Sequence, residues 1–508
     1  MTSYRKLIYT NKLKYYKIRY HYIVCLLLLS IVYQANAQCP KNKLNVIVFV
    51  ADDLGGDGLG VGAFGGKMDN ITPNIDSIAK KSLRFNNMHV NSAICVPSRG
   101  VFATGLYGFN SGQHGFFLTP DSIPTIVESF QKKGYKAGIL GKVKHSSVKQ
   151  TNKWDYEFDE KDLGYGKSPS KYYERAKLFI KQNKENNSPF YFMINSHDPH
   201  RPFQDPNTLL PGSEWPSKMY KPEEVFVPGF LPDLPDVRKE LSHYYNSVRR
   251  LDDTFGAVMK ALKESGEENN TLVIFFSDNG IAMPFAKANN YLASTKTPFF
   301  IYLPGSIKPG ENNDMLSTVD LFPTMMDMID GQKPVRLDGT SFLPLILGKK
   351  QQRKDQVFTE INYLNGANGG RSYPMRGVLD KKYAYIFNPW SDQTKEYRNA
   401  NEGITFKAMQ SVAKTDEKIA NRVKMFRYRE IEELYDLQKD PYCLNNLVSS
   451  PSHAKTKLKY RKAMQQWMQE KSDPMLQIQK LVDEPEEMKK VMDNIYTTIL
   501  KSGPSIKD

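Results

Sequence analysis

Three carboxylates and one amide directly follow two apolar segments of the chain, at Asp52, Asp53, Asp278 and Asn279. Their side chains offer hard oxygen donors, which suit a calcium-like cation. An aspartate after a strand also commonly caps the helix or turn that follows it. Carboxylates gathered at the ends of two strands, however, repel each other unless a cation lies between them. The residues therefore predict a site for one divalent cation such as Ca²⁺.

Three basic residues, Arg99, Lys142 and Lys287, are candidates for binding an anion beside that cation. Any one of them, taken alone, is typical of a surface salt bridge. Gathered at one site, they would place fixed positive charge around a bound anion and around the charge that develops as a bond breaks. We interpret them as anion-binding residues.

Four histidines follow or adjoin polar segments of the chain, and two of them are candidates for proton transfer. Imidazole titrates near neutral pH and can give or take a proton. His145 follows a Gly-Lys segment, and His197 lies in the segment SHDPHR. We expect these two to transfer protons, and we expect His114 and His200 to be structural or to line a substrate pocket.

Short apolar runs alternate with amphipathic helices, which predicts an α/β fold with a mostly parallel sheet between helices. Four of these runs end in polar residues, and they span residues 44–51, 137–140, 190–195 and 271–276. Because ligands bind at the carboxyl ends of parallel strands, we expect the four polar ends to meet in space. Apolar residues at helical spacing over 241–262, followed by Gly266, predict a helix that packs on this sheet.

The segment from Cys95 to Gly105 resembles the sulfatase signature C-x-P-S-R-x-x-x-x-T-G. A lone cysteine is usually a small buried hydrophobe or half of a disulfide, but the number of matching positions favours the resemblance. It implies that Cys95 is oxidised to formylglycine by a maturation enzyme and that the aldehyde hydrate attacks sulfur. The cation would then polarise a sulfate oxygen and also bind the modified Cys95.

The sulfatase resemblance also implies a fold and roles for the two histidines. The fold is a large alkaline-phosphatase-like domain with a mixed, mostly parallel sheet flanked by helices, and a smaller C-terminal α+β domain with a short antiparallel sheet. His197 would donate a proton to the leaving group, and His145 would help to expel sulfate. The family pattern is G-K-x-H, whereas Lys142 lies three residues before His145, so Lys144 is an alternative to Lys142.

Within the family, segments 196–201, 270–281 and 372–376 resemble those of the sulfamidases, and segment 433–447 resembles sulfatases in general. The resemblance implies hydrolysis of the N-sulfate of non-reducing-end glucosamine in heparan sulfate or heparin oligosaccharides. Candidate substrate-binding residues are Arg376, Glu360, Arg371 and His200. The loops between strands set specificity and diverge fastest. Arg376 could equally form a structural ion pair that holds the small domain on the large one.

Three other functions remain compatible with these residues. An O-sulfatase acting on glucosamine 6-sulfate or uronate 2-sulfate would use the same site. A phosphodiesterase or phosphonate hydrolase would suit the same cation and basic residues, because they bind any tetrahedral anion. A catalytically dead glycan-binding relative would keep Cys95 as a thiol.

The chain is organised as residues 1–37, 38–350 and 351–508. Residues 1–37 have the basic start, short apolar run and Ala-Asn-Ala site of a secretory signal peptide. The run is too short to span a bilayer, and Gln38 before Cys39 disfavours a lipid anchor. Residues 38–350 are expected to form the catalytic domain and 351–508 the smaller one. We expect an exported protein, periplasmic or secreted, or lysosomal in a eukaryote.

The net charge indicates which ligands the protein attracts, and the cysteine content indicates whether a disulfide can form. The net charge of +15 falls to about +9 when the signal segment is removed. Such a surface attracts polyanions, and an exported protein without a nucleic-acid motif favours sulfated glycans over nucleic acid. Cys39 and Cys443 could pair in an oxidising compartment or remain free. The sequence does not indicate an oligomeric state.

Overall fold

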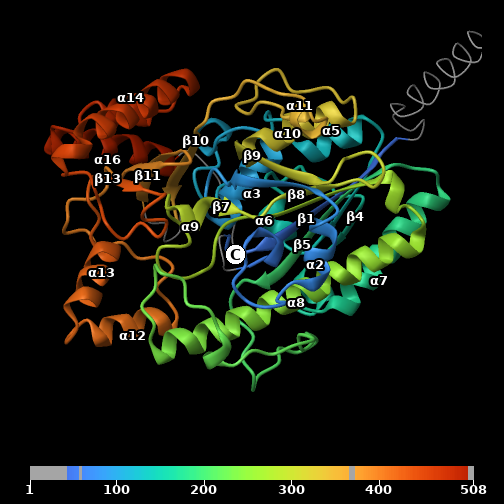
Figure 1. Ribbon diagram of the computed structural model, residues 1–508. Coiled ribbons are helices and arrows are strands. Elements are labelled where there is room, and N and C mark those ends of the chain that lie inside the picture. The colour runs from blue at the N-terminus through green and yellow to red at the C-terminus, as the bar shows by residue number, and fades with distance from the viewer. Residues whose placement is uncertain (1–42, 57–59, 365–371, 502–508) are drawn as a thin grey trace, which may run out of the picture. The chain divides into compact units, whose positions relative to one another are not determined.

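The computed structural model describes residues 43–56, 60–364 and 372–501 (Figure 1). The predicted signal segment, Cys39 and Arg371 lie outside these residues. The chain divides into two units, Met1–Leu44 and Asn45–Asp508, and every described helix and strand lies in the second. Among the described residues, no helix is both long enough and apolar enough to cross a membrane.

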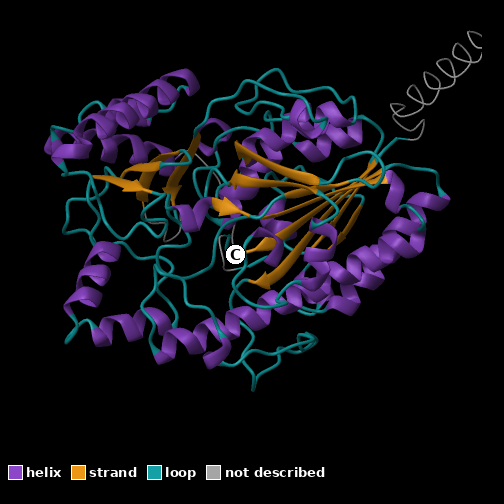
Figure 2. Ribbon diagram, in the orientation of Figure 1, coloured by secondary structure: helices purple, strands orange, loops and turns teal. Residues whose placement is uncertain are grey.

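A mixed sheet forms the centre of the larger part of the molecule (Figure 2). Its strand order is β4-β3-β5-β1-β6-β8-β2-β7, and β9 pairs with β2. The first five strands of that order are mutually parallel, whereas β8 runs antiparallel to β6 and β2. The strands are β1 (Asn45–Asp52), β2 (Leu83–His89), β3 (Lys136–Leu140), β4 (Tyr156–Phe158), β5 (Phe190–Pro199), β6 (Thr271–Ser277), β7 (Lys296–Thr297), β8 (Phe300–Tyr302) and β9 (Gly310–Ser317).

Helices cover both faces of this sheet, so its central strands are buried along their whole length. Every residue of β1, β5 and β6 is buried, as expected of apolar runs in a parallel sheet. α7 (Pro169–Glu185) and α8 (Pro235–Ser265) run along one face, and α3 (Cys95–Thr104), α5 (Ile126–Lys132) and α10 (Leu321–Met328) lie on the other (Figure 1). The left-handed Gly266 ends α8, as the sequence predicts.

A second, four-stranded antiparallel sheet lies in the C-terminal part, in the order β10-β11-β12-β13. Its strands are β10 (Val357–Tyr363), β11 (Ser372–Leu379), β12 (Tyr383–Phe387) and β13 (Glu432–Asp436). The helices of this part are α12 (Ile404–Val412), α13 (Glu417–Arg427), α14 (Ala454–Lys471), α15 (Met475–Gln479) and α16 (Pro485–Lys501). Both sheets confirm the predicted fold class. The boundary at residue 350 stays a prediction.

Short helices complete the connections between these elements. The α-helical ones are α2 (Pro73–Ala79), α4 (Gly108–Ser111), α6 (Val143–Ser146), α9 (Leu292–Thr295) and α11 (Leu343–Ile346). Single 3₁₀ turns lie at Gly62–Phe64, Glu160–Leu163, Pro222–Glu224, Glu268–Asn270, Thr318–Asp320 and Pro451–His453. Strand β10 is joined to the larger part by its own backbone, because the N–H of Glu360 donates to the carbonyl of Asn91 at 2.7 Å.

Candidate active site

The four polar strand ends meet because β3, β5, β1 and β6 are consecutive parallel neighbours. Asp52 and Asp53 stand at the end of β1, beside Asp278 and Asn279 after β6. The backbone N–H of Asp53 donates to Oδ1 of Asp278 at 3.1 Å, and Nδ2 of Asn279 donates to Oδ1 of Asp53 at 2.6 Å. All four residues are buried, so their charges and dipoles act on each other with little screening.

Cys95 is the first residue of α3, and its side chain faces this carboxylate cluster. Its Sγ lies 4.0 Å from Oδ1 of Asp53 and 3.4 Å from Nζ of Lys287. Ligand atoms of Asp52, Cys95 and Asp278 lie within 4.8 Å of one another, as do those of Asp53, Cys95 and His200. Burial raises the pKa of the Cys95 thiol above its ordinary value, although Lys287 lowers it. The unmodified residue is therefore a thiol at neutral pH.

The donor set fits a hard divalent cation. Oδ1 of Asn279 is buried and accepts no hydrogen bond from any residue within the described ranges. Burial and then the charge of Asp52 raise the pKa of Asp278 to about 8. A cation among Asp52, Asp53, Asp278 and Asn279 would give this amide oxygen a partner and remove the repulsion between the carboxylates.

Each of the three carboxylates also faces one basic side chain. Nη2 of Arg99 lies 2.8 Å from Asp278, Nζ of Lys142 lies 2.5 Å from Asp52, and Nζ of Lys287 lies 2.6 Å from Asp53. Burial raises the pKa of Asp52, but Lys142 and the other cations outweigh it and hold that pKa well below its usual range. A bound dication would favour the ionised form of all three carboxylates, whose charges the three basic side chains then balance. The dication would thus give the site the excess positive charge that an anionic substrate requires.

The structure places Lys142, and not Lys144, at the site. Lys142 has left-handed backbone angles of φ 50° and ψ 35° at the start of α6, and its side chain is buried, whereas Lys144 is exposed. The single turn of α6 follows Lys142 and carries Lys144 and His145. Gly141 before it has φ +69°, and a Cβ there would collide with the carbonyl oxygen of Asn195.

Cys95, Lys142 and Lys287 open into a cavity of about 320 Å³. His145 and His200 also line it, and the ring of Phe116 stands edge-on to His145 with centroids 5.6 Å apart. The remaining lining residues are Ile94, Arg201, Ala282, Asn399, Ala400 and Glu402. The cavity thus joins a nucleophilic position, two lysines and two histidines.

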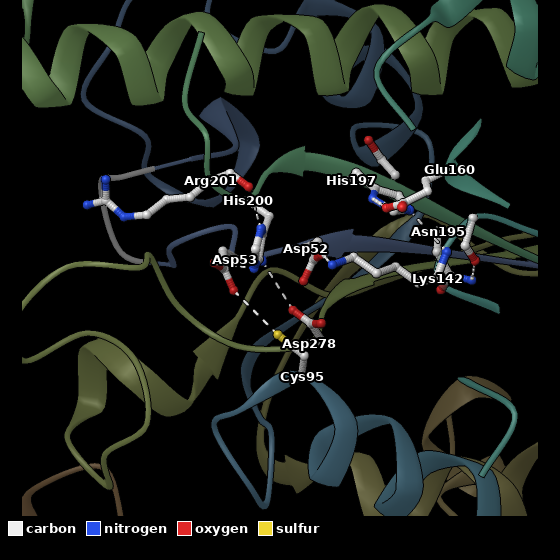
Figure 3. Close-up of polar contacts among 12 residues, drawn as sticks. Asp52, Asp53, Cys95, Lys142, Glu160, Asn195, His197, His200, Arg201 and Asp278 are labelled. Atoms are coloured by element: carbon white, nitrogen blue, oxygen red, sulfur yellow. Dashed lines mark hydrogen bonds and ion pairs between the residues drawn. The ribbon is translucent and has the colours of Figure 1, made fainter. Parts of the chain in front are cut away.

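His197 lies outside this cavity, and His200 takes the place that we expected for it (Figure 3). Nε2 of His197 accepts the backbone N–H of Lys142 at 3.1 Å, and Nδ1 lies 3.9 Å from Glu160. Burial and then Lys142 lower the pKa of His197 well below its usual range. Nε2 of His200 lies 3.9 Å from Oδ2 of Asp53, on the cavity side. Burial and then Lys142 also lower the pKa of His200, to about 4, so position and not pKa distinguishes the two histidines. The position of His197 does not fit its predicted role as proton donor, and His200 is the histidine of the segment that faces the cavity.

Buried charges behind His200 hold its backbone in place. Nζ of Lys167 donates to the carbonyl oxygens of His200 at 3.0 Å and Pro202 at 2.7 Å, and it lies 3.6 Å from Asp198. Asp198 also pairs with Arg250 through two hydrogen bonds of 2.6 and 3.0 Å. Sequence reasoning missed Lys167 and Arg250, because neither belongs to a motif and only folding brings them to the strand end.

Two predicted substrate-binding residues lie in the interior, away from the cavity. Arg376 is fully buried and donates to both carboxylate oxygens of Asp473, at 2.6 and 3.0 Å. Glu360 is 1% exposed and accepts hydrogen bonds from the backbone N–H of Gly108 and from Nδ2 of Asn362. Neither offers surface to a sugar, so both are withdrawn as substrate ligands. Arg371 lies outside the described residues.

The free Cys443 is buried, and its candidate partner Cys39 is among the residues that the structure does not describe.

Asn195 in β5 is a further residue that sequence reasoning missed. Its Oδ1 accepts from Nη1 of Arg99 at 2.5 Å, and its Nδ2 donates to the carbonyl of Gly141 at 2.9 Å. It thereby ties the Arg99 guanidinium to the loop that carries Lys142.

The chain resembles known sulfatases over most of its length. The family model described as Sulfatase matches residues 44–331, and the model described as N-sulphoglucosamine sulphohydrolase, C-terminal, matches residues 283–398. The chain is 27% identical over 486 residues to N-sulphoglucosamine sulphohydrolase of Homo sapiens, covering 86% of this chain and 92% of that protein. It is 30% identical over 450 residues to an ulvan-active sulfatase of Formosa agariphila, covering 85% and 81%.

The same fold occurs in a solved structure of a protein in complex with its substrate, D-glucosamine-2-N,6-O-disulfate. The TM-score is 0.62 at 17% sequence identity, and the superposition covers 85% of this chain and 99% of that one.

Proposed function

This chain belongs to the sulfatase family, the hydrolases of sulfuric esters and sulfamates, and from that premise we propose that it desulfates the end of a sulfated glycan. The favoured substrate is N-sulfated glucosamine at the non-reducing end of heparan sulfate or heparin oligosaccharides. Support for this sugar comes from the match of residues 283–398 to the C-terminal model of the N-sulphoglucosamine sulphohydrolases.

One observation carries the proposal: Cys95, Lys142, Lys287, His145 and His200 line the same cavity. We propose that a maturation enzyme converts Cys95 to formylglycine, whose hydrate attacks sulfur. Lys142 and Lys287 would then stabilise the charge on the sulfate oxygens as the bond to the sugar breaks. Arg99, which is buried behind the cavity lining, would add positive charge at longer range while it holds Asp278.

His200 would donate the proton that the departing sugar amine or hydroxyl requires, and His145 would accept a proton as sulfate leaves the modified Cys95. An anionic substrate beside the His200 ring raises its pKa and thus favours the protonated form that a donor needs. Lys167, by fixing the carbonyl of His200, would keep the ring in reach of the leaving group.

A Ca²⁺ ion would be held by Asp52, Asp53, Asp278, Asn279 and the modified Cys95. Bound there, it would supply Lewis-acid polarisation of a sulfate oxygen. Nδ2 of Asn279 donates a hydrogen bond to Asp53 and so orients that carboxylate, whereas Oδ1 of Asn279 would be available to bind the ion.

The size of the cavity supports action on one terminal sugar. About 320 Å³ is at the lower end of the range for ligand pockets in proteins, roughly 300 to 1,000 Å³. A monosaccharide with its sulfate fits such a volume better than the interior of a long chain does. Because residues 1–37 resemble a signal peptide, we propose that the enzyme acts on oligosaccharides after export, in the periplasm or outside the cell.

An O-sulfatase with the same site is the second candidate, favoured by the 27% identity over 409 residues to iduronate 2-sulfatase of Homo sapiens. The basic residues bind the sulfate group, and they do not distinguish an S–N bond from an S–O bond. The identity of the leaving atom therefore has to be measured.

The test combines mass spectrometry of the Cys95 peptide from natively exported protein with sulfate release from N-sulfoglucosamine and from glucosamine 6-sulfate. We expect formylglycine at position 95 and release from the N-sulfated sugar, with no release by Cys95→Ala. Release from only the O-sulfated sugar would keep the mechanism and overturn the substrate. An active protein whose Cys95 is unmodified would overturn the mechanism.

A further inference from the structure

A segment from the C-terminal part of the chain forms one wall of the cavity. Asn399, Ala400 and Glu402 line it together with Cys95 and Lys142, and the name rim segment is used for residues 399–402. The segment lies between β12 and α12, far in sequence from every residue of the carboxylate cluster. It is therefore placed by contacts at its two ends.

The first end of the rim segment is attached beside Lys287. Tyr397 is buried, and its hydroxyl donates to the carbonyl oxygen of Ala288 at 2.7 Å, one residue after Lys287. The backbone N–H of Tyr397 donates to the carbonyl of Arg427 at 2.8 Å. Any shift of this end would also displace the loop that carries the Lys287 ammonium.

The other end is attached beside His200. Arg201, the next residue, pairs with Glu240 at 2.6 Å, and its Nε and Nη2 donate to the carbonyl of Ala282. The second oxygen of Glu240 accepts the backbone N–H of Thr405 at 2.8 Å. Gly403 packs so closely on this ion pair that a Cβ would collide with both side chains. The rim segment is thus held between the Lys287 loop and the His200 strand end.

The charge of the rim segment is opposite to that of the lysines in the cavity lining. Glu402 is exposed, lines the cavity and forms no ion pair with any residue of the described ranges, whereas Lys142 and Lys287 in the same lining each pair with an aspartate. Asn399 is half-buried and presents an amide on the same wall. Arg201 also lines the cavity, but its guanidinium is paired with Glu240. A sugar whose sulfate binds beside Lys142 and Lys287 therefore has the unpaired carboxylate of Glu402 and the amide of Asn399 for its other substituents.

We propose that Glu402 is a specificity-determining residue that, with Asn399, selects terminal sugars whose only anionic group is the sulfate to be removed. Hydroxyl or amino groups of such a sugar can donate hydrogen bonds to the Glu402 carboxylate, while Asn399 can donate or accept. A second sulfate or a carboxylate on the same sugar would be repelled by the Glu402 carboxylate. Such repulsion lowers the affinity for sugars with two anionic groups and so makes the site selective. The inference rests on the proposed desulfation of a glycan end.

The test compares N-sulfoglucosamine with N,6-O-disulfoglucosamine. For the parent enzyme, we expect kcat/KM to be higher for the monosulfated sugar. Glu402→Gln keeps the shape of the side chain and removes its charge, and we expect it to raise the relative kcat/KM of the disulfated sugar about tenfold, as a charge pair at partial screening would. Glu417→Gln, which removes an exposed carboxylate at the start of α13, should leave the ratio unchanged.

A binding measurement separates this inference from the proposed function. The relative affinities of the two sugars are measured by calorimetry on Cys95→Ala protein, with and without Glu402→Gln. The inference would be overturned if Glu402→Gln changed neither the ratio of the two affinities nor the ratio of the two kcat/KM values. No sulfate release by the parent, combined with a ratio that changes at Glu402→Gln in binding, would support the inference and overturn the proposed function.

Discussion

The backbone N–H of Lys142 donates a hydrogen bond to Nε2 of His197, with an N···N distance of 3.1 Å. The histidine thus uses one ring nitrogen to hold the turn from which the Lys142 ammonium reaches Asp52. A nitrogen that accepts this hydrogen bond cannot give a proton to a leaving group. His197 is therefore a positioning residue in this geometry, and the cavity leaves proton transfer to His145 and His200.

Substitution of the two histidines should have different effects. We expect His200→Gln to lower kcat by a factor of about 10² to 10⁴, which is typical for loss of a general acid, with little change in stability. His197→Ala should lower the free energy of unfolding by about 1–3 kcal/mol, because the buried N–H of Lys142 loses its acceptor. Urea unfolding and steady-state kinetics on both variants check this. A loss of kcat at His197→Ala as large as at His200→Gln, with unchanged stability, would contradict the assignment.

Replacement of the two lysines in the G-K-x-K-H segment should separate their roles. Lys142→Met removes the cation that lies 2.5 Å from Asp52, and we expect kcat/KM to fall at least about a hundredfold. Lys144→Met is the matched control, because the same change is made on an exposed side chain two residues away, and its kcat/KM should stay within about twofold. Comparable losses at both positions would show that Lys144 also takes part.

Removal of the divalent cation should lower both activity and stability. We expect Ca²⁺ added to chelator-treated protein to raise the unfolding free energy by about 2.7 kcal/mol at a hundredfold excess over its Kd. Asn279→Ala should weaken that Kd at least about tenfold, since it deletes an oxygen ligand. Asn313→Ala, on an exposed asparagine, is the control. Calcium titrations followed by calorimetry measure both, and an unchanged Kd in Asn279→Ala would argue against this ligand set.

The buried pair of Arg376 and Asp473 should contribute to stability and not to substrate binding. Arg376→Met leaves the Asp473 carboxylate buried without its partner, and we expect a loss of about 3–5 kcal/mol in unfolding free energy. The double change Arg376→Met with Asp473→Leu should recover most of this loss. KM for the sulfated sugar is the decisive measurement, because a large increase in KM in the stable double variant would return Arg376 to the substrate site.

Acid should destabilise the fold through His89. Burial, and next Lys296, lower the pKa of His89 to about 3, so the folded protein keeps this imidazole neutral. The unfolded chain takes up a proton below about pH 6.5, so stability falls as pH drops below that value, by up to about 1.4 kcal/mol per pH unit. We expect a loss of about 2–3 kcal/mol from this group between pH 6.5 and 4.5.

Urea unfolding of the parent and of His89→Gln at several pH values measures this effect. The variant has no group that titrates at position 89, so its stability should decline less between pH 6.5 and 4.5. Parallel pH profiles for the two proteins would rule His89 out as the cause.

Several features could be predicted from the sequence because they depend on local pattern. Continuous apolar runs mark β1, β5 and β6, since strands buried on both faces need no polar side. Polar residues directly after those runs mark the strand ends where a ligand site forms. The signature residues from Cys95 to Gly105 lie within and directly after the short helix α3, so they are contiguous in sequence and the motif can be recognised there. The carboxylates were expected from their place after the strands, and the basic residues from the positive charge that a bound anion requires.

The tertiary structure alone decided which of these side chains face the cavity. His197 and His200 share one short segment, and their directions depend on how the end of β5 packs against the Lys142 turn and Lys167. Arg376 is removed from the surface by Asp473, 97 residues away. The rim segment is placed at the cavity by its flanking residues Tyr397 and Thr405, which bind Ala288 and Glu240. Residue type determines what chemistry a side chain can do, but long-range packing determines where it points, and no local pattern encodes that packing.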